Sequence, residues 1–336
     1  MAKKQFPTLE SIIKHLNIAY SLDVTSLIPL LIGADKDASV YQAKTSGKDS
    51  YFIKLKADNS CFYPSVIMWL QQQGISRVLP VIKTARDKLY ERINGFTLTV
   101  FPFVTGENGF NRALTEEQWI LLGKTLKKIH QIKVPNWIKN NIRQETYSSQ
   151  WHQAIETLYI RINTEQSSDE IGTAFCAFMN QQATTLRRLT TRAEQLAQTI
   201  PKKSIPFVFC HGDLHAGNVL LDDNNSFYIV DWDNPIMAPK ERDLMFIGGG
   251  VGNVWNKINE QDLFYQGYGE IEINSLILSY YRFERIIEDI VLFGQQLLDK
   301  TCDDGIRAES YKEFIGQFEP TGVVEIAFKT GEKLVM

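Results

Sequence analysis

Hydrophobic and polar positions change their period partway along the chain. Residues 8–20 place apolar side chains three and four positions apart, behind a threonine at position 8, and this spacing predicts an amphipathic helix with Thr8 as its N-cap. Residues 51–56 alternate instead, with the aliphatic side chains on one face and two lysines on the other. Such alternation predicts a half-buried strand.

The rest of the first hundred residues is expected to be rich in strands, with one inserted helix. The helix covers 64–73, where Pro64 suits the first turn and Gly74 ends it. A turn at Arg92–Gly95 precedes the last strand of this part. The other strands are expected at 28–32, 40–44, 78–83 and 97–104.

Helical periodicity dominates after Gly106. Residues 116–133 repeat large apolar side chains every three or four positions. Two long helices are expected in 147–200, further helices in 259–300 and 309–331, and short strands in 205–231. A strand-rich small half followed by a helix-rich large half predicts an α+β fold with two lobes. We expect a nucleotide-binding lobe at 1–104 and a catalytic, substrate-binding lobe at 105–336.

Composition narrows the function classes. The 336 residues carry a net charge of −3, which is unlike the basic footprint of a nucleic-acid-binding protein. The four cysteines form no C-x-x-C pair, so zinc-site spacing is absent and buried thiols in a reducing compartment are expected. No apolar run follows Lys3 and Lys4, and none is long enough to span a membrane. We therefore expect a cytoplasmic monomer with no membrane or nucleic-acid partner.

The most informative segment is a predicted hairpin whose β runs cover 219–221 and 227–230. Because the outer ends of a hairpin's strands meet, Asn218 and Asp231 are expected to lie close together. Amide and carboxylate oxygens are hard ligands that suit Mg²⁺. Asp213 lies five residues before Asn218 on the same loop, where it can orient a hydroxyl and accept its proton.

This segment reads His211-Gly212-Asp213-Leu214-His215-Ala216-Gly217-Asn218, followed by Val230-Asp231-Trp232-Asp233. The pattern H-G-D-x-H-x-x-N with a later I/V-D-x-D resembles the signature of the aminoglycoside phosphotransferase and choline kinase family, the counterpart of H-R-D and D-F-G in protein kinases. The resemblance implies a bilobal, protein-kinase-like fold and a kinase that uses ATP and Mg²⁺. It also implies that Asp213 is the catalytic base, that Asn218 and Asp231 hold Mg²⁺, and that His211 props the loop.

The resemblance extends to the nucleotide side of the site. Lys54 ends the run Phe52-Ile53-Lys54, as does the strand-three lysine that binds the α- and β-phosphates in kinases. Lys56 shares its face and is the rival for this role. A single glycine stands in the loop 33–40, where a glycine-rich loop is expected, and Ser39 is small enough to bring backbone N–H groups to phosphate.

The stretch 99–106 resembles the hinge between the lobes of a kinase. There the adenine edge would meet backbone groups near Phe101 and Phe103, while Pro102 has no N–H to donate. Core packing is the alternative explanation for these two aromatic residues.

One departure from the family pattern concerns the partner of Lys54. Kinases pair the strand-three lysine with a glutamate from the following helix, but Asp58 is the only acidic residue between Lys54 and Arg86. Asp58 is too near Lys54 in sequence to lie within the helix expected at 64–73. The ion pair is therefore missing or supplied otherwise, which also admits a pseudokinase that binds nucleotide and acts as a scaffold.

The acceptor wall is expected in the C-terminal helices. Tyr281, Glu284 and Glu288 share one face of a predicted helix, and an aromatic ring with two acids suits an amine-bearing alcohol. Asp233, directly after the hairpin, is a further candidate substrate residue. The alternative for the helix is a solvated face without a ligand.

Several other polar residues read as structural. His130 falls on a packing helix and is expected in the core, and His215 is expected to support the catalytic loop. Asp243 resembles a family aspartate that braces this loop. The glycines at 248–250 indicate a linker or a tight helix contact rather than a phosphate loop.

The family includes kinases of several small alcohols, and the catalytic loop does not choose among them. The run Ala238–Phe246, the adjacent glycines and the leucine-rich N-terminal region resemble those of spectinomycin phosphotransferases, over nearly the whole chain. This resemblance implies an enzyme that phosphorylates an aminocyclitol antibiotic and so confers resistance. A metabolic kinase for choline, homoserine or a sugar is the alternative. A protein kinase is disfavoured because no A-P-E segment follows Asp231-Trp232-Asp233.

Overall fold

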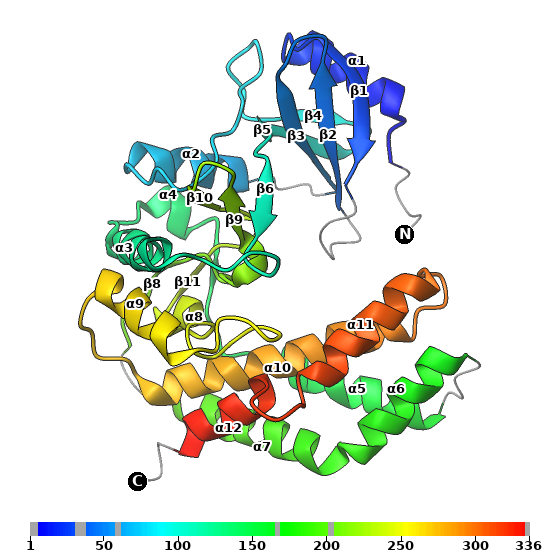
Figure 1. Ribbon diagram of the computed structural model, residues 1–336, viewed down its shortest axis with the longest axis vertical. Coiled ribbons are helices and arrows are strands. Elements are labelled where there is room, and N and C mark those ends of the chain that lie inside the picture. The colour runs from blue at the N-terminus through cyan, green and yellow to red at the C-terminus, as the bar shows by residue number, and fades with distance from the viewer. Residues whose placement is uncertain (1–5, 31–37, 58–61, 165–168, 201–204, 333–336) are drawn as a thin grey trace. The chain divides into compact units, whose positions relative to one another are not determined.

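In the computed structural model, the N-terminal part of the chain forms a five-stranded antiparallel sheet (Figure 1). The residues described are 6–30, 38–57, 62–164, 169–200 and 205–332. Neighbouring strands lie in the order β1-β2-β3-β5-β4. Their bounds are β1 Val24–Pro29, β2 Ala38–Thr45, β3 Ser50–Lys56, β4 Glu91–Ile93 and β5 Phe96–Pro102.

The first helix, α1 (Leu9–Ala19), packs its apolar stripe against this sheet. The Thr8 side chain accepts a hydrogen bond from the amide of Ser11, which confirms the predicted N-cap. Ile12 and Leu16 are fully buried in one cluster with Ile53 and Leu55 of β3. Burial of every second residue in β3 follows the predicted alternation and leaves Lys54 and Lys56 on the opposite face.

The division into two compact units does not follow a single cut in the sequence. One unit comprises residues 1–114, 132–142 and 217–235, and the other comprises 115–131, 143–216 and 236–336. The first unit therefore includes the predicted hairpin as well as the sheet. The lobe boundary expected between Val104 and Thr105 stays a prediction.

The first unit is completed by a second sheet and two helices. Its sheet has the order β10-β9-β6, and the antiparallel pair β9 and β10 is the predicted hairpin. The inserted helix forms as expected, one residue earlier than the predicted 64–73. Pro64 lies in its first turn, and Gly74 follows its end in the left-handed region at φ 74°. The bounds are α2 Tyr63–Gln72, β6 Gly106–Asn108, α4 Asn136–Lys139, β9 Val219–Asp222 and β10 Phe227–Ile229.

The prediction of a strand at 78–83 is wrong. Only isolated bridges form there, at Val78 and Ile82. The partner of β5 at that edge is β4, which ends in a turn at Asn94 and Gly95 with φ of 51° and 82°. The turn signal was therefore right, but the strand before it is shorter and later than expected.

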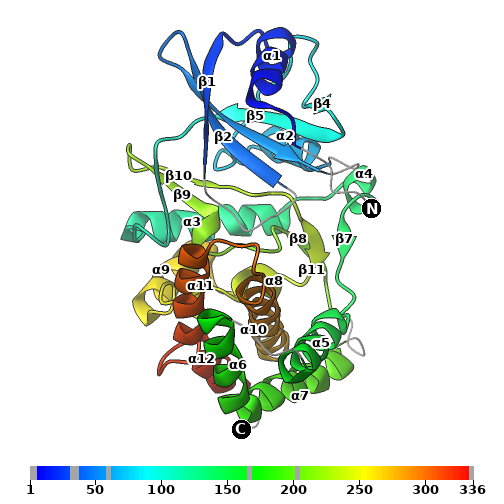
Figure 2. The same ribbon diagram turned by 90° about the vertical axis from the view of Figure 1, so that its right-hand side faces the viewer.

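The second unit is mainly helical and is built around α10 (Ser275–Leu297). This helix packs against α5, α7, α11 and α12, which surround it in Figures 1 and 2. The helices are α3 Glu116–Gln131, α5 Gln150–Thr164, α6 Glu170–Gln181, α7 Ala183–Thr199, α8 Glu241–Leu244, α9 Ile258–Tyr268, α11 Asp304–Gly316 and α12 Val323–Glu332. A small sheet has the order β7-β11-β8, with β7 Arg143–Gln144, β8 Val208–Cys210 and β11 Ile236–Ala238.

Helix count in this unit departs from expectation in two places. The described residues of 147–200 form three helices rather than two, because Asp169 caps a new helix and α7 begins after Gln182, where α6 ends. The stretch 309–331 contains parts of two helices, separated at 317–322. Helical periodicity predicts the apolar faces of helices well. A break between two helices can be only a few residues long, so it hardly changes the pattern of apolar positions. The α+β class, with a sheet-rich N-terminal part and a helical C-terminal part, is confirmed.

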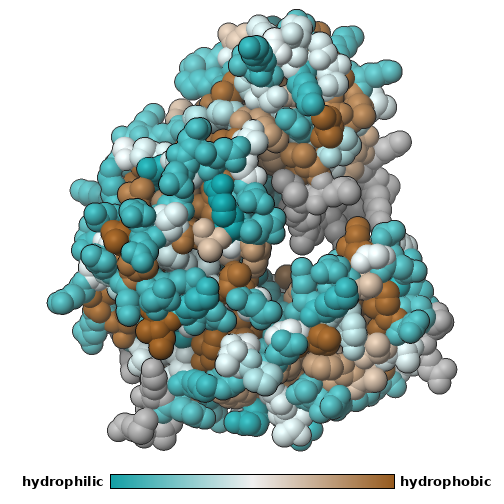
Figure 3. Space-filling model, in the orientation of Figure 1, coloured by the Kyte–Doolittle hydropathy of each residue, from teal (hydrophilic) through white to brown (hydrophobic). Residues whose placement is uncertain are grey.

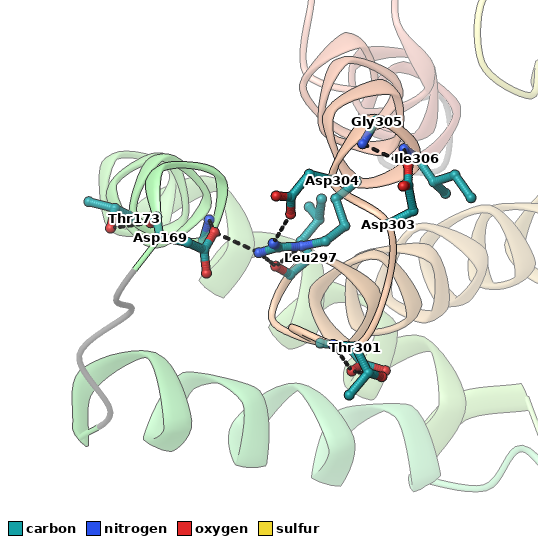
Figure 4. Close-up of polar contacts among 11 residues, drawn as sticks. Asp169, Thr173, Leu297, Thr301, Asp303, Asp304, Gly305 and Ile306 are labelled. Carbon is teal, nitrogen blue, oxygen red and sulfur yellow. Dashed lines mark hydrogen bonds and ion pairs between the residues drawn. The ribbon is translucent and has the colours of Figure 1, made fainter.

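One buried arginine ties the ends of three helices together. Arg307 in α11 has an exposed side-chain fraction of 2% and donates to the N-cap residue of α6, Asp169, at 2.7 Å. It also donates to Asp304 at 2.8 Å and to the carbonyl of Leu297, the last residue of α10, at 2.7 Å. Figure 4 shows Asp169, Asp304 and Leu297 converging on this point. The guanidinium thus satisfies groups at helix ends that would otherwise lack partners.

Exposed apolar side chains are scattered over the surface. On the face seen in Figure 3, brown patches are separated by hydrophilic residues. The most exposed large aliphatic side chains, Ile18, Ile160 and Ile258, come from three different helices. Isolated apolar residues of this kind are normal on a protein surface. Among the described residues, no helix has both the length and the apolar character needed to cross a bilayer.

Candidate active site

The hairpin brings the two predicted metal ligands to the same end of its ribbon. Val219 pairs with Ile229, and the amide of Val230 donates to the carbonyl of Asn218 at 2.9 Å. Asp231, the next residue, adopts a left-handed φ of 62°. Non-glycine residues rarely adopt this conformation, and where they do it often serves a site. The backbones of Asn218 and Asp231 therefore lie close together at one end of the hairpin, as the sequence predicted, and their role as metal ligands stays a prediction.

Lys54 makes ion pairs with two aspartates of the same unit. Its Nζ lies 2.8 Å from Asp231 Oδ1 and 2.8 Å from Asp233 Oδ1. Burial disfavours the charged amine, but the two carboxylates outweigh this effect and raise the pKa of Lys54. Lys56, the rival, lies 2.6 Å from Asp233 Oδ2. Lys54 therefore contacts both the predicted metal ligand, Asp231, and Asp233.

No acidic residue of α2 pairs with Lys54, since this helix contains none. Lys54 instead lies over the ring of Tyr63 at 5.5 Å from its centroid, and the Tyr63 hydroxyl donates to Thr99 in β5 at 2.8 Å. Asp58, the only acid near Lys54 in the sequence, lies outside the described residues. Lys54 thus has two aspartates after the hairpin as its acidic partners, whereas kinases use a helix glutamate.

The candidate adenine-side residues lie at the end of β5. Phe101 is buried and its ring lies 6.2 Å from that of Phe52. Phe103 is partly exposed, and its amide donates to the carbonyl of Ser50 at 3.1 Å. Ser39 lies in β2, at a half-buried position, while residues 31–37 of the predicted glycine-rich loop lie outside the described part of the chain. The nucleotide-binding roles of Phe101, Phe103 and Ser39 stay predictions.

In the second unit, a buried aspartate holds the backbone of the loop that carries Asp213. Asp243 accepts hydrogen bonds from the amides of His211 at 2.9 Å and Gly212 at 2.8 Å. Gly212 has a φ of 89°, which favours glycine at this position. The neighbouring Arg242 donates to the carbonyl of Gly212 at 2.9 Å. This geometry confirms that Asp243 braces the loop, and it fixes the backbone that carries Asp213.

His130 has a polar role that the sequence did not reveal. Its ring is buried, as expected, but Nε2 lies 3.0 Å from Asp243 Oδ2 and Nδ1 lies 2.7 Å from the Tyr268 hydroxyl. Burial opposes ionisation of Asp243, while His130, His211 and the Gly212 amide outweigh it and lower its pKa. His130 therefore stabilises the bracing carboxylate. Its position on an apolar helix face gave no signal for this contact.

Asp213 has one arginine and two histidines of the second unit as neighbours. One carboxylate oxygen accepts a hydrogen bond from Arg285 in α10, and the other lies 3.5 Å from His215 Nε2. The Asp213 amide donates to His211 Nδ1 at 3.3 Å, so His211 packs within the loop. Burial opposes ionisation, but Arg285 and His215 prevail and hold the pKa of Asp213 well below its usual range. Asp213 is thus an ionised carboxylate whose side chain is 42% exposed.

Comparison with known proteins assigns this combination of groups to a family. The sequence model described as the phosphotransferase enzyme family matches residues 30–271 of the chain. This chain belongs to the phosphotransferase enzyme family. It is therefore a kinase that acts on a hydroxyl group, as the motif around Asp213 predicted.

Solved structures of phosphotransferases agree with this assignment. The spectinomycin phosphotransferase solved with ADP and spectinomycin has a TM-score of 0.90 and 42% sequence identity, covering 97% of this chain and 99% of that one. The same enzyme's AMP complex has a TM-score of 0.85, also at 42% identity, and covers 96% and 99%. An aminoglycoside phosphotransferase from Alicyclobacillus acidocaldarius has a TM-score of 0.60 at 12% identity, covering 99% and 98%, and this shows the fold alone. The search of curated proteins gave no match. The predicted protein-kinase-like fold is confirmed.

The predicted acceptor residues of this phosphotransferase are mostly engaged inside the second unit. Tyr281 is fully buried and its hydroxyl donates to Glu145 at 3.0 Å. Glu284 is buried and lies 2.9 Å from His152 Nε2. Glu288 is partly exposed, and burial raises its pKa despite the neighbouring Arg285. These contacts favour structural roles for Tyr281 and Glu284, and substrate binding by any of the three stays a prediction.

Asp233, the fourth predicted substrate residue, is also engaged in ion pairs within its own unit. Its side chain is 7% exposed and both oxygens face lysines, Lys54 and Lys56. Its contacts favour a role on the nucleotide side of the enzyme.

Sequence reasoning missed Arg285 as a partner of Asp213, although its i,i+4 spacing to Asp289 indicated that it would be anchored on the helix.

Proposed function

We propose that this phosphotransferase transfers the γ-phosphoryl group of ATP to a hydroxyl of an aminocyclitol antibiotic, and that spectinomycin is its acceptor. Phosphorylation adds negative charge and bulk to the antibiotic, so the reaction would confer resistance. The observation that carries the proposal is the 42% identity over 97% of the chain to an enzyme solved with ADP and spectinomycin. Identity that extends over nearly the whole length includes the acceptor-binding part as well as the nucleotide-binding part.

The residues present fit a magnesium ion. Asn218 and Asp231 offer an amide oxygen and a carboxylate at one end of the hairpin, and hard oxygen ligands with few protein donors are typical of Mg²⁺ sites that also bind phosphate. When bound, Mg²⁺ would neutralise charge on the phosphate oxygens. Lys54 would bind the phosphates, and Asp231 would then exchange its pairing with the lysine for the metal.

Asp213 would orient the acceptor hydroxyl and take its proton. As the acceptor oxygen forms a bond to the γ-phosphorus, the bond from that phosphorus to the β,γ-bridging oxygen breaks and ADP leaves with the bond's electron pair. Because phosphoryl transfer has a loose transition state, the carboxylate needs to position the hydroxyl more than to be a strong base. A carboxylate kept ionised by Arg285 and His215 suits that role.

The alternatives have less support. Choline kinase from Streptococcus pneumoniae is 13% identical with a TM-score of 0.56, which shows a shared fold and nothing about the acceptor. The argument for a pseudokinase was the missing glutamate, and Lys54 has acidic partners in Asp231 and Asp233. Monomeric state and cytoplasmic location stay predictions.

A coupled assay of ADP release tests the proposal. Purified protein with Mg·ATP would be offered spectinomycin, kanamycin, choline and homoserine, with the Asp213→Ala variant in parallel. We expect turnover on spectinomycin that the variant loses, and a phosphorylated product by mass spectrometry. Turnover on choline or homoserine without turnover on either antibiotic would contradict the proposed acceptor. Bound Mg·ATP with no turnover on any compound would contradict the proposed reaction for these acceptors.

A further inference from the structure

The contact between α10 and the catalytic loop has no counterpart in the motif that identifies the family. Arg285 stands 72 residues beyond Asp213 and donates from Nη1 to its Oδ1. Asp213 is the proposed base, so whatever fixes its carboxylate fixes the hydroxyl that it orients. A displacement of about 1 Å at such a group can cost roughly 10²-fold in rate.

Arg285 is itself held on the side away from Asp213. Its Nε donates to Asp289 Oδ1 at 2.9 Å, one helical turn further along α10. Its guanidinium carbon lies 5.3 Å from the centroid of the Phe246 ring. That ring is 2% exposed and also contacts the ring of His215, at 5.7 Å between centroids. Arg285 is therefore anchored by a carboxylate and an aromatic face while it holds the base.

The segment that carries Phe246 is fixed by the same helix. Arg282, three residues before Arg285 and thus on the same side of α10, donates to the carbonyls of Met245 at 3.0 Å and Ile247 at 2.9 Å. Through Arg282, helix α10 holds the segment that carries the Phe246 ring. Through Arg285, it holds the Asp213 carboxylate. A guanidinium suits this task because its planar fork satisfies two carboxylates in fixed directions, which a lysine ammonium does not.

The charges facing this pair come from several elements. Asp213 is faced by His211 and His215 of its own loop, by Arg285 of α10 and by Arg143 of β7. Arg285 is faced by Asp213 and by two acids of its own helix, Glu288 and Asp289. Removing the guanidinium would therefore take away the cation that directly contacts both Asp213 and Asp289, and repulsion among the three acidic groups would move the Asp213 carboxylate.

We propose that Arg285 is a positioning residue for phosphoryl transfer, which acts by holding the Asp213 carboxylate in a fixed orientation from its anchorage on Asp289 and Phe246. The inference rests on the proposed function, because it assigns Arg285 a part in that same reaction. Arg285 does not touch the nucleotide or the acceptor in this scheme. Its loss would lower kcat and leave the affinity for Mg·ATP unchanged.

The test compares Arg285→Ala, Arg285→Lys and Asp289→Asn with the wild type, with the exposed Arg187→Ala in α7 as a matched control. We expect kcat on spectinomycin to fall about 10²-fold in Arg285→Ala, to fall less in Arg285→Lys, and to fall several-fold in Asp289→Asn. Mg·ATP affinity by calorimetry would be unchanged in all of them, which also shows that each variant folds. Added guanidinium ion would restore part of kcat in Arg285→Ala only.

Each outcome decides the inference. A kcat in Arg285→Ala within twofold of wild type would overturn it, and so would a loss of kcat that guanidinium cannot restore and that Arg285→Lys shares in full. If Arg285→Ala fails to fold, an unchanged kcat in Asp289→Asn would overturn the anchoring of the arginine. Absence of wild-type turnover would instead overturn the proposed function, and this inference with it.

Discussion

Lys54 in β3 and Asp233 after β10 form an ion pair of 2.8 Å, although they lie 179 positions apart in the sequence. The second oxygen of Asp233 binds Lys56 at 2.6 Å, so one buried carboxylate holds both lysines on this face of the strand. In kinases a helix glutamate orients the strand-three lysine. Here α2 contains no acidic residue, and Asp233, two positions after the predicted metal ligand Asp231, pairs with Lys54 instead.

Substitution of Asp233 by asparagine is expected to raise KM for ATP about tenfold while changing KM for the acceptor little. Loss of one charge-assisted hydrogen bond costs about 1.5–3 kcal/mol, and a mispositioned Lys54 binds phosphate less well. Steady-state kinetics with ATP varied would measure the effect. Asp223→Asn, an exposed position in the hairpin turn, is the matched control. A rise confined to the acceptor's KM would instead support the substrate role first predicted for Asp233.

Alanine at position 231 is expected to abolish magnesium-dependent binding of nucleotide. Asp231 supplies the carboxylate next to Asn218, and Mg²⁺ with few protein ligands depends on each of them. Calorimetric titration of ATP with and without Mg²⁺ would measure the difference. An Asp231→Ala protein that binds Mg·ATP as tightly as wild type would show that the metal is held elsewhere.

Alanine at position 213 is expected to lower kcat by roughly 10²–10⁴-fold, the usual contribution of a positioned general base. ATP affinity is expected to stay near that of wild type, because the proposed role of Asp213 is to orient the acceptor hydroxyl, and its carboxylate contacts Arg285 and His215. Single-turnover kinetics would separate the chemical step from product release. Wild-type activity in this variant would exclude Asp213 as the base.

The buried His152 is expected to make stability depend on pH. It lies 2.9 Å from Glu284 of α10 and 3.0 Å from Glu194 of α7. Burial opposes its charged form, but the two glutamates outweigh this effect and raise its pKa. A raised pKa in the folded state means that the imidazolium's contribution is fully present below about pH 6.5, the unfolded value, and is lost as pH rises through the folded value.

Denaturant unfolding of wild type and His152→Asn at several pH values would measure this contribution. The difference in the free energy of unfolding is expected to be larger at pH 6 than at pH 9. Glu284→Gln, which removes one of the two glutamates, is expected to reduce the pH dependence. A difference that stays constant across this range would show that His152 does not gain a proton on folding.

Replacement of Arg307 by methionine is expected to destabilise the helical unit by about 2–3 kcal/mol, because Asp169 and the Leu297 carbonyl lose a charged donor. Asp304→Asn is the control, since that partner is 84% exposed and exposed pairs contribute at most about 1 kcal/mol. Thermal or urea unfolding would compare the two. Equal small effects would mean that packing alone holds the ends of α6, α10 and α11 together.

Local features of the chain were predictable because their causes are local. The Thr8 cap and the alternation of β3 depend on residues within a few positions of each other, and both are confirmed. The hairpin also followed from its turn and its short β runs, which brought Asn218 to Asp231. Element boundaries were less predictable. The edge strand beside β5 is β4 at Glu91–Ile93 rather than a strand at 78–83, and the described residues of 147–200 form three helices.

The sequence by itself determined the α+β class, the phosphotransferase motif and the residue types that carry the reaction, because a continuous motif encodes its own spacing. Only the tertiary structure decided which charges meet. Asp233, a candidate substrate residue in the sequence, pairs with Lys54, and Arg285 contacts Asp213 from a distant helix. Such pairs join segments that lie far apart along the chain, and no periodicity relates them. Which ion pairs form depends on the packing of whole elements, since burial makes an unpaired charge costly and selects the partner that the fold brings within reach.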